Sequence, residues 1–211
     1  MKTQAKDKML LLGCLGCGSS IVEAALTLAQ LPYDYEEANY DLPEIREKLL
    51  KVNPLGQVPV LILPSGEKLT ESAGIINYIQ HLVPEVRLIP SSTSENIQYW
   101  RWVAFLIAAI YPSFTYGDFP ERWAGAEGKD HLRNATEEWR KKLWLEVERS
   151  AKSEESFLST FSAIDLYLTA MVHWRPRRPW FAENCPKIHG ISERVLHRKD
   201  LAPIWQKNFG H

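Results

Sequence analysis

The stretch NPLGQVPVLILPSGEKLTESAGIINYI, residues 53–79, carries three local structural signals in succession. Residues 58–63 are apolar and partly β-branched, which favours a buried strand. The Pro-Ser-Gly-Glu segment at 64–67 has the residue types of a tight turn, and residues 68–70 return as a short strand. An apolar helical pattern follows over 73–81. The stretch therefore predicts a β-hairpin that leads directly into a helix.

Upstream of this stretch, the pattern alternates between strand and helix. Residues 9–12 form a short apolar run typical of a buried strand, and a helical pattern runs from residue 19 or 20 to 28. Residues 33–38 alternate like a second strand, and a helix is expected over 43–50. With the hairpin and its helix, the order is β-α-β-α-β-β-α. A thioredoxin-like α/β domain requires this order, and we assign it to residues 1–83.

Downstream, the pattern changes to helices only. Residues 84–93 contain prolines and hydroxyl side chains, which indicates a linker. Beyond it no segment has a strand pattern, and we predict an all-α helical bundle over residues 94–211. The expected helices span residues 95–110, 131–151, 164–175, 186–197 and 201–209. A Ser-x-x-Asp pattern at 162–165 is a capping box for the third of these helices.

The overall composition limits what the chain binds. Its 211 residues are 45% hydrophobic and 24% charged, which is ordinary for a globular protein and large enough for two small domains. The longest apolar run, residues 103–110, is far shorter than the ~20 residues that span a bilayer. The formal net charge of −1 argues against nucleic acid as the main partner. We therefore expect a small-molecule ligand, no membrane and no nucleic acid.

Cysteine and histidine usage points in the same direction. Three cysteines, at positions 14, 17 and 185, do not make a disulfide framework, so a reducing, cytoplasmic location is expected. The apolar stretch before Cys14 is also shorter than the about 7–15 residues of a signal-peptide core. The six histidines show no metal-ligand spacing. No metal is predicted.

Residues 53–79 resemble the glutathione-binding half of cytosolic glutathione transferases. The resemblance implies that Val58 offers its backbone to the cysteinyl part of glutathione, that Pro59 is cis, and that Gln57 belongs to the same site. It also implies that Glu71 meets the α-ammonium group of the γ-glutamyl end and Ser72 its α-carboxylate. A helix N-terminus suits a carboxylate, because its first N–H groups lack helical partners. On the residues alone, Ser72 as a plain helix cap is an equal alternative.

In the same family the glutathione thiol is activated in the turn after the first strand, here residues 13–20, by a tyrosine, serine or cysteine. We locate these positions by counting back without gaps from Pro32. The tyrosine-type position falls on Leu12, the serine-type position on Gly16 and the cysteine-type position on Gly18. The chain therefore departs from the family pattern at all three positions.

The two neighbours of Gly18, Cys17 and Ser19, are predicted jointly as catalytic. The serine hydroxyl would stabilise the glutathione thiolate while it adds to an electrophile. A cysteine near a helix N-terminus has a lowered pKa and would instead form a mixed disulfide with glutathione. Cys14 and Cys17 also make a C-x-x-C, the spacing of a thioredoxin-like redox pair. A packed, inert Cys14 and a Ser19 that only caps the helix are the competing interpretations.

An aromatic block follows the first long helix of the C-terminal half. In the resembled family the hydrophobic co-substrate lies against that helix, so Tyr111, Tyr116 and Trp123 are predicted to line its pocket. For each single ring, plain core packing is the competing interpretation. The block, together with the turn at 13–20 and residues 21–24, is similar to a bacterial subgroup of the family.

The resemblance as a whole implies a glutathione transferase fold with a pocket between its two domains. The implied activity is conjugation of the glutathione thiolate to small hydrophobic electrophiles, a detoxification reaction, by a homodimeric enzyme. One alternative is a glutathione-dependent thiol–disulfide oxidoreductase or deglutathionylase that uses Cys17. The other is a non-catalytic module that keeps the fold and binds ligands or proteins.

Overall fold

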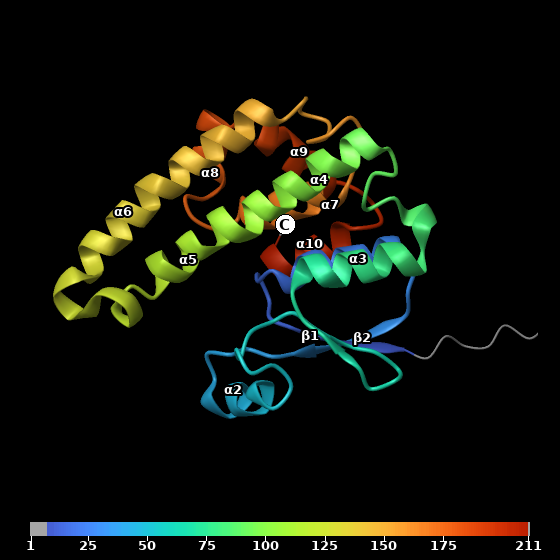
Figure 1. The fold of residues 1–211 in the computed structure, drawn as a ribbon, viewed down its shortest axis with the longest axis horizontal. Coiled ribbons are helices and arrows are strands. Elements are labelled where there is room, and N and C mark those ends of the chain that lie inside the picture. The colour runs from blue at the N-terminus through green and yellow to red at the C-terminus, as the bar shows by residue number, and fades with distance from the viewer. Residues whose placement is uncertain (1–7, 211) are drawn as a thin grey trace, which may run out of the picture. The chain divides into compact units, whose positions relative to one another are not determined.

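The computed structural model describes residues 8–210, so residues 1–7 and 211 of the predicted domain ranges lie outside it. The chain forms two compact units. Unit 1 contains the described residues up to Leu88 together with those from Val195 onward, and unit 2 is Ile89–Arg194. Figure 1 shows the helices and strands of both units.

Unit 1 has the predicted α/β order, which confirms its thioredoxin-like topology. Each strand and helix lies within a few residues of its expected range. Its elements are β1 (Met9–Gly13), α1 (Ser19–Leu28), β2 (Tyr33–Glu37), α2 (Pro43–Leu50), β3 (Val60–Ile62), β4 (Lys68–Leu69), α3 (Ser72–Leu82), the short 3-10 helix η1 (Pro84–Val86) and the terminal helix α10 (Ala202–Phe209).

The four strands of unit 1 form one mixed sheet in the order β2-β1-β3-β4. β1 is parallel to β2 and antiparallel to β3, and β4 is antiparallel to β3. Leu11 and Leu61 are paired across β1 and β3 and are fully buried. Their neighbours Leu12 and Val60 point to the other face, where they pack with Leu49 of α2. Figure 1 shows α2 and α3 on opposite sides of the strands.

The terminal helix α10 packs on α1 within unit 1. Lys207 of α10 forms an ion pair of 2.6 Å with Glu23 of α1, whose side chain is only 3% exposed. Asn208 donates a second hydrogen bond to the same carboxylate, 3.1 Å long. A segment 184 residues away in the chain thus completes the N-terminal unit. The sequence-based boundaries at residues 83 and 94 stay a prediction beside this division.

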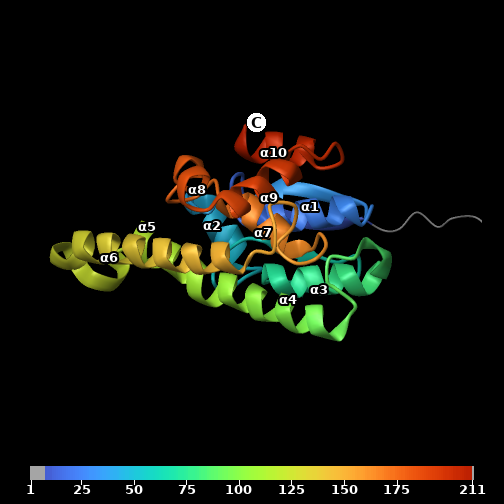
Figure 2. The same cartoon turned by 90° about the horizontal axis from the view of Figure 1, so that it is seen from above.

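The described part of unit 2 consists of helices and loops, as the sequence predicts. Figures 1 and 2 show α5 and α6 running side by side. The elements are α4 (Thr93–Phe105), the π-helical turn η2 (Leu106–Ile110), α5 (Tyr111–Asp118), α6 (Glu121–Ser150), α7 (Ala163–Met171), α8 (Arg178–Asn184) and α9 (Pro186–Leu196), of which the last two residues belong to unit 1.

Two polar contacts fix the packing of unit 2. The buried Arg140 of α6 donates to the hydroxyl and the carbonyl of Ser113 in α5, at 2.9 and 2.6 Å, and its guanidinium lies 4.2 Å from the centroid of the Phe114 ring. The predicted capping box is confirmed at the start of α7. The carboxylate of Asp165 accepts the backbone N–H of Ser162 at 2.7 Å, and the Ser162 hydroxyl accepts the N–H of Ile164 at 3.3 Å. Both side chains are fully buried.

The structure differs from the predicted helix limits in unit 2. Residues 111–118 are helical, and α6 begins at Glu121, ten residues before the expected start at 131. Residues 178–184, for which no helix was predicted, form α8. Prolines stand in the first turns of α5 and α8, where a missing N–H costs nothing, although proline in a sequence normally signals a break. Within residues 8–210, no helix is long and apolar enough to cross a membrane.

Candidate thiol and glutathione site

Four chain segments of unit 1 meet at one end of the sheet, where β1, β2 and β4 finish and β3 begins. β1 pairs with β3 so that Leu12 lies opposite Val60, which places the residues after β1 beside those that precede β3. β4 pairs with β3 so that Leu69 lies opposite Leu61, and the start of α3 therefore reaches the same end of the sheet. β2 runs parallel to β1 and ends there as well. The strand register alone thus brings the turn at 13–20, the Val58–Pro59 bond and the start of α3 together.

The loop before β3 is organised by the buried side chain of Asn53. Its carbonyl oxygen accepts the N–H of Leu55 at 3.1 Å, and its amide donates to the backbone carbonyl of Gln57 at 2.8 Å. Gly56 has a φ of 61°, which a glycine adopts without strain. The peptide bond between Val58 and Pro59 is cis, as the resemblance implied. Gln57 is exposed, Val58 half-buried and Pro59 buried.

The start of α3 is partly exposed, with Ser72 half-buried and Gly74 exposed. Glu71 precedes the helix with a φ of 61° and an exposed side chain, and Ser72 is its first residue. A side chain built at Gly74, in the first turn, would meet no atom within 4 Å. The first turn of an 11-residue helix with open space beside it can accept a carboxylate. The exposed Glu71 carboxylate stands next to it for an ammonium group.

The residues Cys14 to Cys17 form a tight turn between β1 and α1. The N–H of Cys17 donates to the carbonyl of Cys14 at 3.1 Å, and Gly16 has a φ of 72°. These features are those of a type II turn, whose third residue requires a positive φ. Gly16, on which the serine-type position of the family falls, is therefore needed by the turn itself.

Cys17 is the more acidic of the two thiols. Its pKa is lowered, first by a hydrogen bond from Cys14 and then by Tyr40, whose hydroxyl lies 3.7 Å from Cys17 Sγ, while burial and the carboxylate of Glu37 oppose this. Cys17 also lies immediately before the first turn of α1, where the helix dipole favours negative charge. A partly exposed thiol in these surroundings has a raised thiolate population.

Cys14 has the opposite tendency. Its pKa is raised, first by its hydrogen bond to Cys17, then by burial, and then by the nearby carboxylate of Glu37. A thiol that donates a hydrogen bond to a thiolate keeps its own proton. In the pair, the pKa of Cys17 is lowered and that of Cys14 is raised, and both thiols are partly exposed and free in the structure.

Ser19 lies in the same turn but is fully buried. Its hydroxyl donates to the carbonyl of Cys14 at 3.0 Å and accepts the N–H of Cys14 at 3.0 Å. A side chain at Gly13 would lie 2.9 Å from this hydroxyl and 2.7 Å from the Tyr35 ring, so the site has no room for one. Of the two predicted catalytic residues, Cys17 is thus accessible to a ligand and Ser19 is engaged with the backbone of the turn.

Helix α10 supports the turn from behind. The side-chain carbonyl of Asn208 accepts the N–H of Gly16 at 3.3 Å, while its amide donates to Glu23. Lys207 lies 3.3 Å from the centroid of the Tyr35 ring. Sequence reasoning missed Asn208 and Tyr40. No pattern marks a residue 192 positions away, whereas a tyrosine just after β2 was open to a topological argument, because β1 and β2 are parallel.

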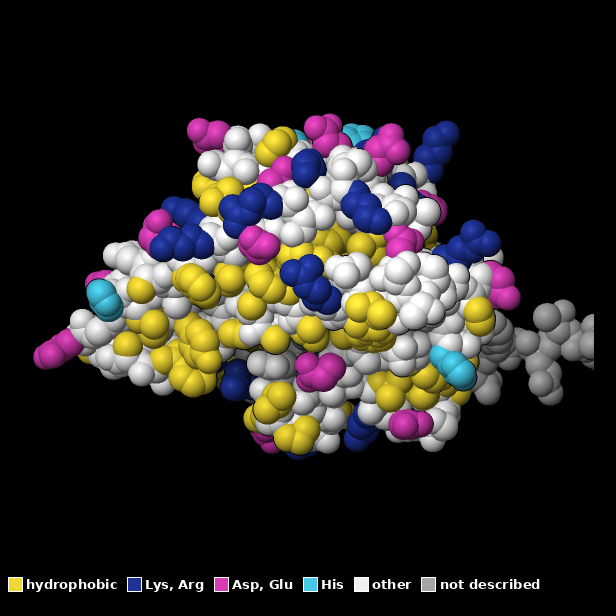
Figure 3. All heavy atoms as spheres, turned by 45° about the horizontal axis from the view of Figure 1, so that its top comes forward, with side chains coloured by type: hydrophobic (Ala, Val, Ile, Leu, Met, Phe, Trp, Pro, Cys, Tyr) yellow, Lys and Arg dark blue, Asp and Glu magenta, His cyan; other side chains and the backbone are white. Residues whose placement is uncertain are grey.

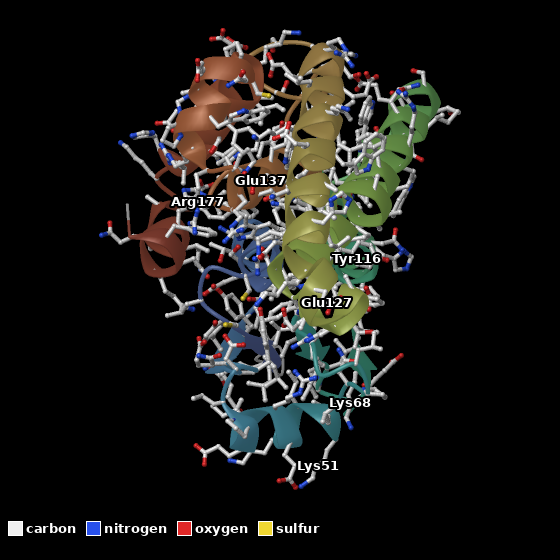
Figure 4. The ribbon with its side chains drawn as sticks, turned by 90° about the vertical axis from the view of Figure 1, so that its left-hand side faces the viewer. Lys51, Lys68, Tyr116, Glu127, Glu137 and Arg177 are labelled. Carbon is white, nitrogen blue, oxygen red and sulfur yellow. The ribbon has the colours of Figure 1, made fainter. Side chains whose placement is uncertain are left out.

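The predicted co-substrate residues belong to unit 2. The Tyr111 ring contacts the Trp174 ring edge-on, with centroids 5.3 Å apart. Tyr116, labelled in Figure 4, contacts Trp123 edge-on at 4.9 Å. Trp123 is 57% exposed and Tyr116 38%, whereas Tyr111 is half-buried. The rings of Tyr116 and Trp123 thus have surface available for a ligand.

No metal site is found in the described chain, and the face drawn in Figure 3 has no patch of a single charge sign. Among residues 8–210, no group of three or more His, Cys, Asp and Glu side chains could hold a metal ion. Acidic and basic side chains are interspersed on the face drawn in Figure 3.

The glutathione transferase class is defined by a thioredoxin-like unit joined to a helical unit. At one end of its sheet the thioredoxin-like unit carries a thiol turn, a cis proline and a helix N-terminus. The family model for the glutathione S-transferase N-terminal domain matches residues 13–81. The uncharacterized GST-like protein YncG of Escherichia coli K12 is 33% identical over 199 residues, which cover 93% of this chain and 96% of that protein. The chain belongs to the glutathione transferase family.

Solved structures agree in fold. A glutathione transferase homolog from Sulfitobacter, solved with bound glutathione, has a TM-score of 0.81 at 21% identity and covers 95% of this chain and 98% of its own. The beta-class glutathione S-transferase of Sphingomonas chungbukensis has a TM-score of 0.78 at 24% identity, over 96% of this chain and 100% of its own. Both confirm the predicted transferase fold.

Proposed function

We propose that this protein binds glutathione at the described end of the unit 1 sheet and conjugates its thiolate to small hydrophobic electrophiles. The observation that carries the proposal is the strand register, which brings the Cys14–Cys17 turn, Val58–Pro59 and the N-terminus of α3 to one end of the sheet. The glutathione bound in the Sulfitobacter homolog supports it. The proposal includes a cytoplasmic enzyme that acts in detoxification and needs no metal.

The γ-glutamyl end of glutathione is assigned to the start of α3. Its α-carboxylate accepts N–H groups of the first turn and the hydroxyl of Ser72, and its α-ammonium pairs with the exposed carboxylate of Glu71. The cysteinyl backbone pairs with Val58, which Pro59 holds in place, and Gln57 contacts the ligand from the adjoining loop. Because these segments lie at the same end of the sheet as the Cys14–Cys17 turn, the glutathione sulfur faces Cys17.

The hydrophobic co-substrate is assigned to Tyr111, Tyr116 and Trp123. The exposed rings of Tyr116 and Trp123 provide apolar surface with polar tips, which suits aromatic electrophiles. Tyr111 would support them from its contact with Trp174. Their contribution concerns electrophile binding and not glutathione binding.

The test is a comparison of two Michaelis constants in a conjugation assay with glutathione and a chlorinated aromatic electrophile. Replacing Glu71 and Ser72 by alanine should raise the KM for glutathione and its Kd about 10- to 100-fold, because charge-assisted hydrogen bonds are lost. Glu67→Ala, in the exposed hairpin turn, is the matched control. Trp123→Ala should raise only the KM for the electrophile, with the equally exposed Trp139→Ala as control.

Two outcomes would contradict the assignment. If the Glu71 and Ser72 replacements leave the Kd for glutathione unchanged, the γ-glutamyl site lies elsewhere. If the wild type binds glutathione but conjugates no electrophile, the chain is a binding module with a transferase fold.

A second candidate function is thiol–disulfide exchange at Cys17. The specific observation in its favour is the position of Cys17, a free and partly exposed thiol just before α1 whose Sγ lies 3.7 Å from the Tyr40 hydroxyl, surroundings in which its pKa is lowered. In this reaction the Cys17 thiolate attacks a glutathione mixed disulfide, takes the glutathionyl group and releases the other thiol. Free glutathione then removes the group as glutathione disulfide.

A further inference from the structure

We propose that Cys14 and Cys17 form a reversible dithiol–disulfide pair, in which Cys17 attacks, Cys14 resolves and the Tyr40 hydroxyl donates to the Cys17 thiolate. The proposal adds a two-cysteine reaction to the conjugation proposed above. It does not depend on glutathione binding at α3, because any small disulfide can supply the oxidising equivalents.

The turn brings the two cysteines within bonding reach. They are the first and fourth residues of a hydrogen-bonded β-turn, in which Cα atoms lie less than about 7 Å apart, and disulfides span about 4.4–6.8 Å. Each thiol shifts the pKa of the other, raising that of Cys14 and lowering that of Cys17. Gly16 allows this turn, and Asn208 accepts the Gly16 N–H and steadies it.

The surroundings determine which cysteine attacks. Cys17 precedes the N-terminus of α1 and has Cys14 and Tyr40 as hydrogen-bond partners, whereas the carboxylates of Glu37 and Asp41 act against its thiolate. The carboxylate of Glu37 accepts the N–H of Leu15 in the same turn at 3.2 Å, and its charge raises the pKa of Cys14. The second cysteine of this C-x-x-C, and not the first, is therefore the nucleophile.

The reaction balances as follows. The Cys17 thiolate attacks one sulfur of a low-molecular-weight disulfide RSSR, forming Cys17–S–S–R and releasing RS⁻, which takes a proton from water. Once Cys17 no longer bears a charge, Cys14 loses its proton and attacks Cys17 Sγ, which forms the Cys14–Cys17 disulfide and expels the second RS⁻. Counted from the dithiol, whose Cys17 proton passes to solvent before the attack, the protein loses two electrons and two protons, and both RS⁻ take up protons to become RSH. Two thiols of the same class reverse the steps.

Cys185 provides an internal control for these assignments. It is fully buried in unit 2, and burial raises its pKa to about 12. Its thiol donates a long hydrogen bond of 3.9 Å to the carbonyl of Trp144. We expect it to stay reduced and unmodified under conditions that oxidise the turn.

The experiment incubates the folded full-length protein with glutathione disulfide or with oxidised dithiothreitol, blocks free thiols with an alkylating agent and measures the intact mass. Wild type should lose two alkylatable thiols without gaining a glutathionyl group. Cys14→Ser should trap one glutathionyl group on Cys17, and Cys17→Ser should gain none. Cys185→Ser should behave like wild type, and circular dichroism checks the fold of each variant.

Tyr40→Phe tests the role of the hydroxyl. At neutral pH it should slow alkylation of Cys17 about 3- to 10-fold and move the midpoint of the alkylation pH profile upward, without changing disulfide formation at equilibrium. An unchanged pH profile would remove Tyr40 from the proposal.

Other outcomes would overturn the pair itself. These are a wild type that keeps both thiols, or one that accumulates glutathionyl groups, or a Cys17→Ser variant that is trapped as readily as Cys14→Ser. Oxidised dithiothreitol separates this proposal from the glutathione site. The variant with alanine at positions 71 and 72 should still form the disulfide with it, even if its glutathione binding is lost.

Discussion

At the scale of single residues, the chemistry of the site depends on which side chain of the turn is free to react. Ser19 uses its hydroxyl to donate to one backbone group of Cys14 and to accept from another, and it is fully buried. Cys17 is partly exposed and has a lowered pKa. The departure of this chain from the family positions at Gly16 and Gly18 therefore does not leave the turn without a reactive group.

This difference gives a prediction for two single substitutions. Cys17→Ser should lose exchange with a glutathione mixed disulfide by more than about 100-fold but keep conjugation within about tenfold, because a hydroxyl donates to a thiolate and cannot form a disulfide. Ser19→Ala should keep both activities and lose about 1–3 kcal/mol of unfolding free energy, because it leaves the N–H of Cys14 without its acceptor and removes one of the two donors to the Cys14 carbonyl. Rates of both reactions and urea unfolding measure these effects.

The opposite pattern would assign the roles differently. If Cys17→Ser keeps exchange, the nucleophile is another group. If Ser19→Ala loses conjugation while its unfolding free energy stays at the wild-type value, Ser19 contacts the glutathione sulfur.

At the scale of elements, α10 acts as a support for the reactive turn. Asn208 is buried and bridges the N–H of Gly16 and the carboxylate of Glu23, which itself is nearly inaccessible to water. A carboxylate held away from water needs such partners, because an unpaired buried charge is strongly unfavourable. The terminal helix is thus part of the site, although it contributes no reactive group.

Replacing Asn208 by alanine should therefore have two effects. The unfolding free energy should fall by about 1–3 kcal/mol, because two buried hydrogen bonds lose a partner, and Cys17 alkylation should change rate because the turn loses its support. Gln206→Ala, exposed on the same helix, is the matched control and should leave both unchanged. Stability loss without any change in the Cys17 rate would limit Asn208 to a structural role.

At the scale of the whole molecule, the resemblance implies a homodimer. Light scattering of the purified protein should give twice the mass of the chain, and the value should persist on dilution through the micromolar range. Cys14→Ser and Cys17→Ser should give the same mass, because their thiols pair within one chain. A single-chain mass at every concentration would contradict the expected homodimer.

The sequence by itself determined the elements of unit 1. Strand and helix patterns in the first 82 residues are local, and each followed from period, turn residues and breakers. It was less informative in unit 2, because prolines inside the first turns of α5 and α8 resemble breaks although the helix tolerates them there. The resemblance over residues 53–79 supplied the expectation that Pro59 is cis, which no local pattern contains.

Tertiary structure alone decided the arrangement around the sulfur chemistry. Sequence left Cys17 and Ser19 equal, because the accessibility of a hydroxyl and the pKa of a thiol depend on neighbours from β2, α1 and α10. Tyr40 and Asn208 reach the turn only when the strands pair in register and the last helix returns to α1. Local propensities fix elements, but electrostatics and burial act through space, so our proposal of Cys17 over Ser19 rests on the folded chain and not on the sequence.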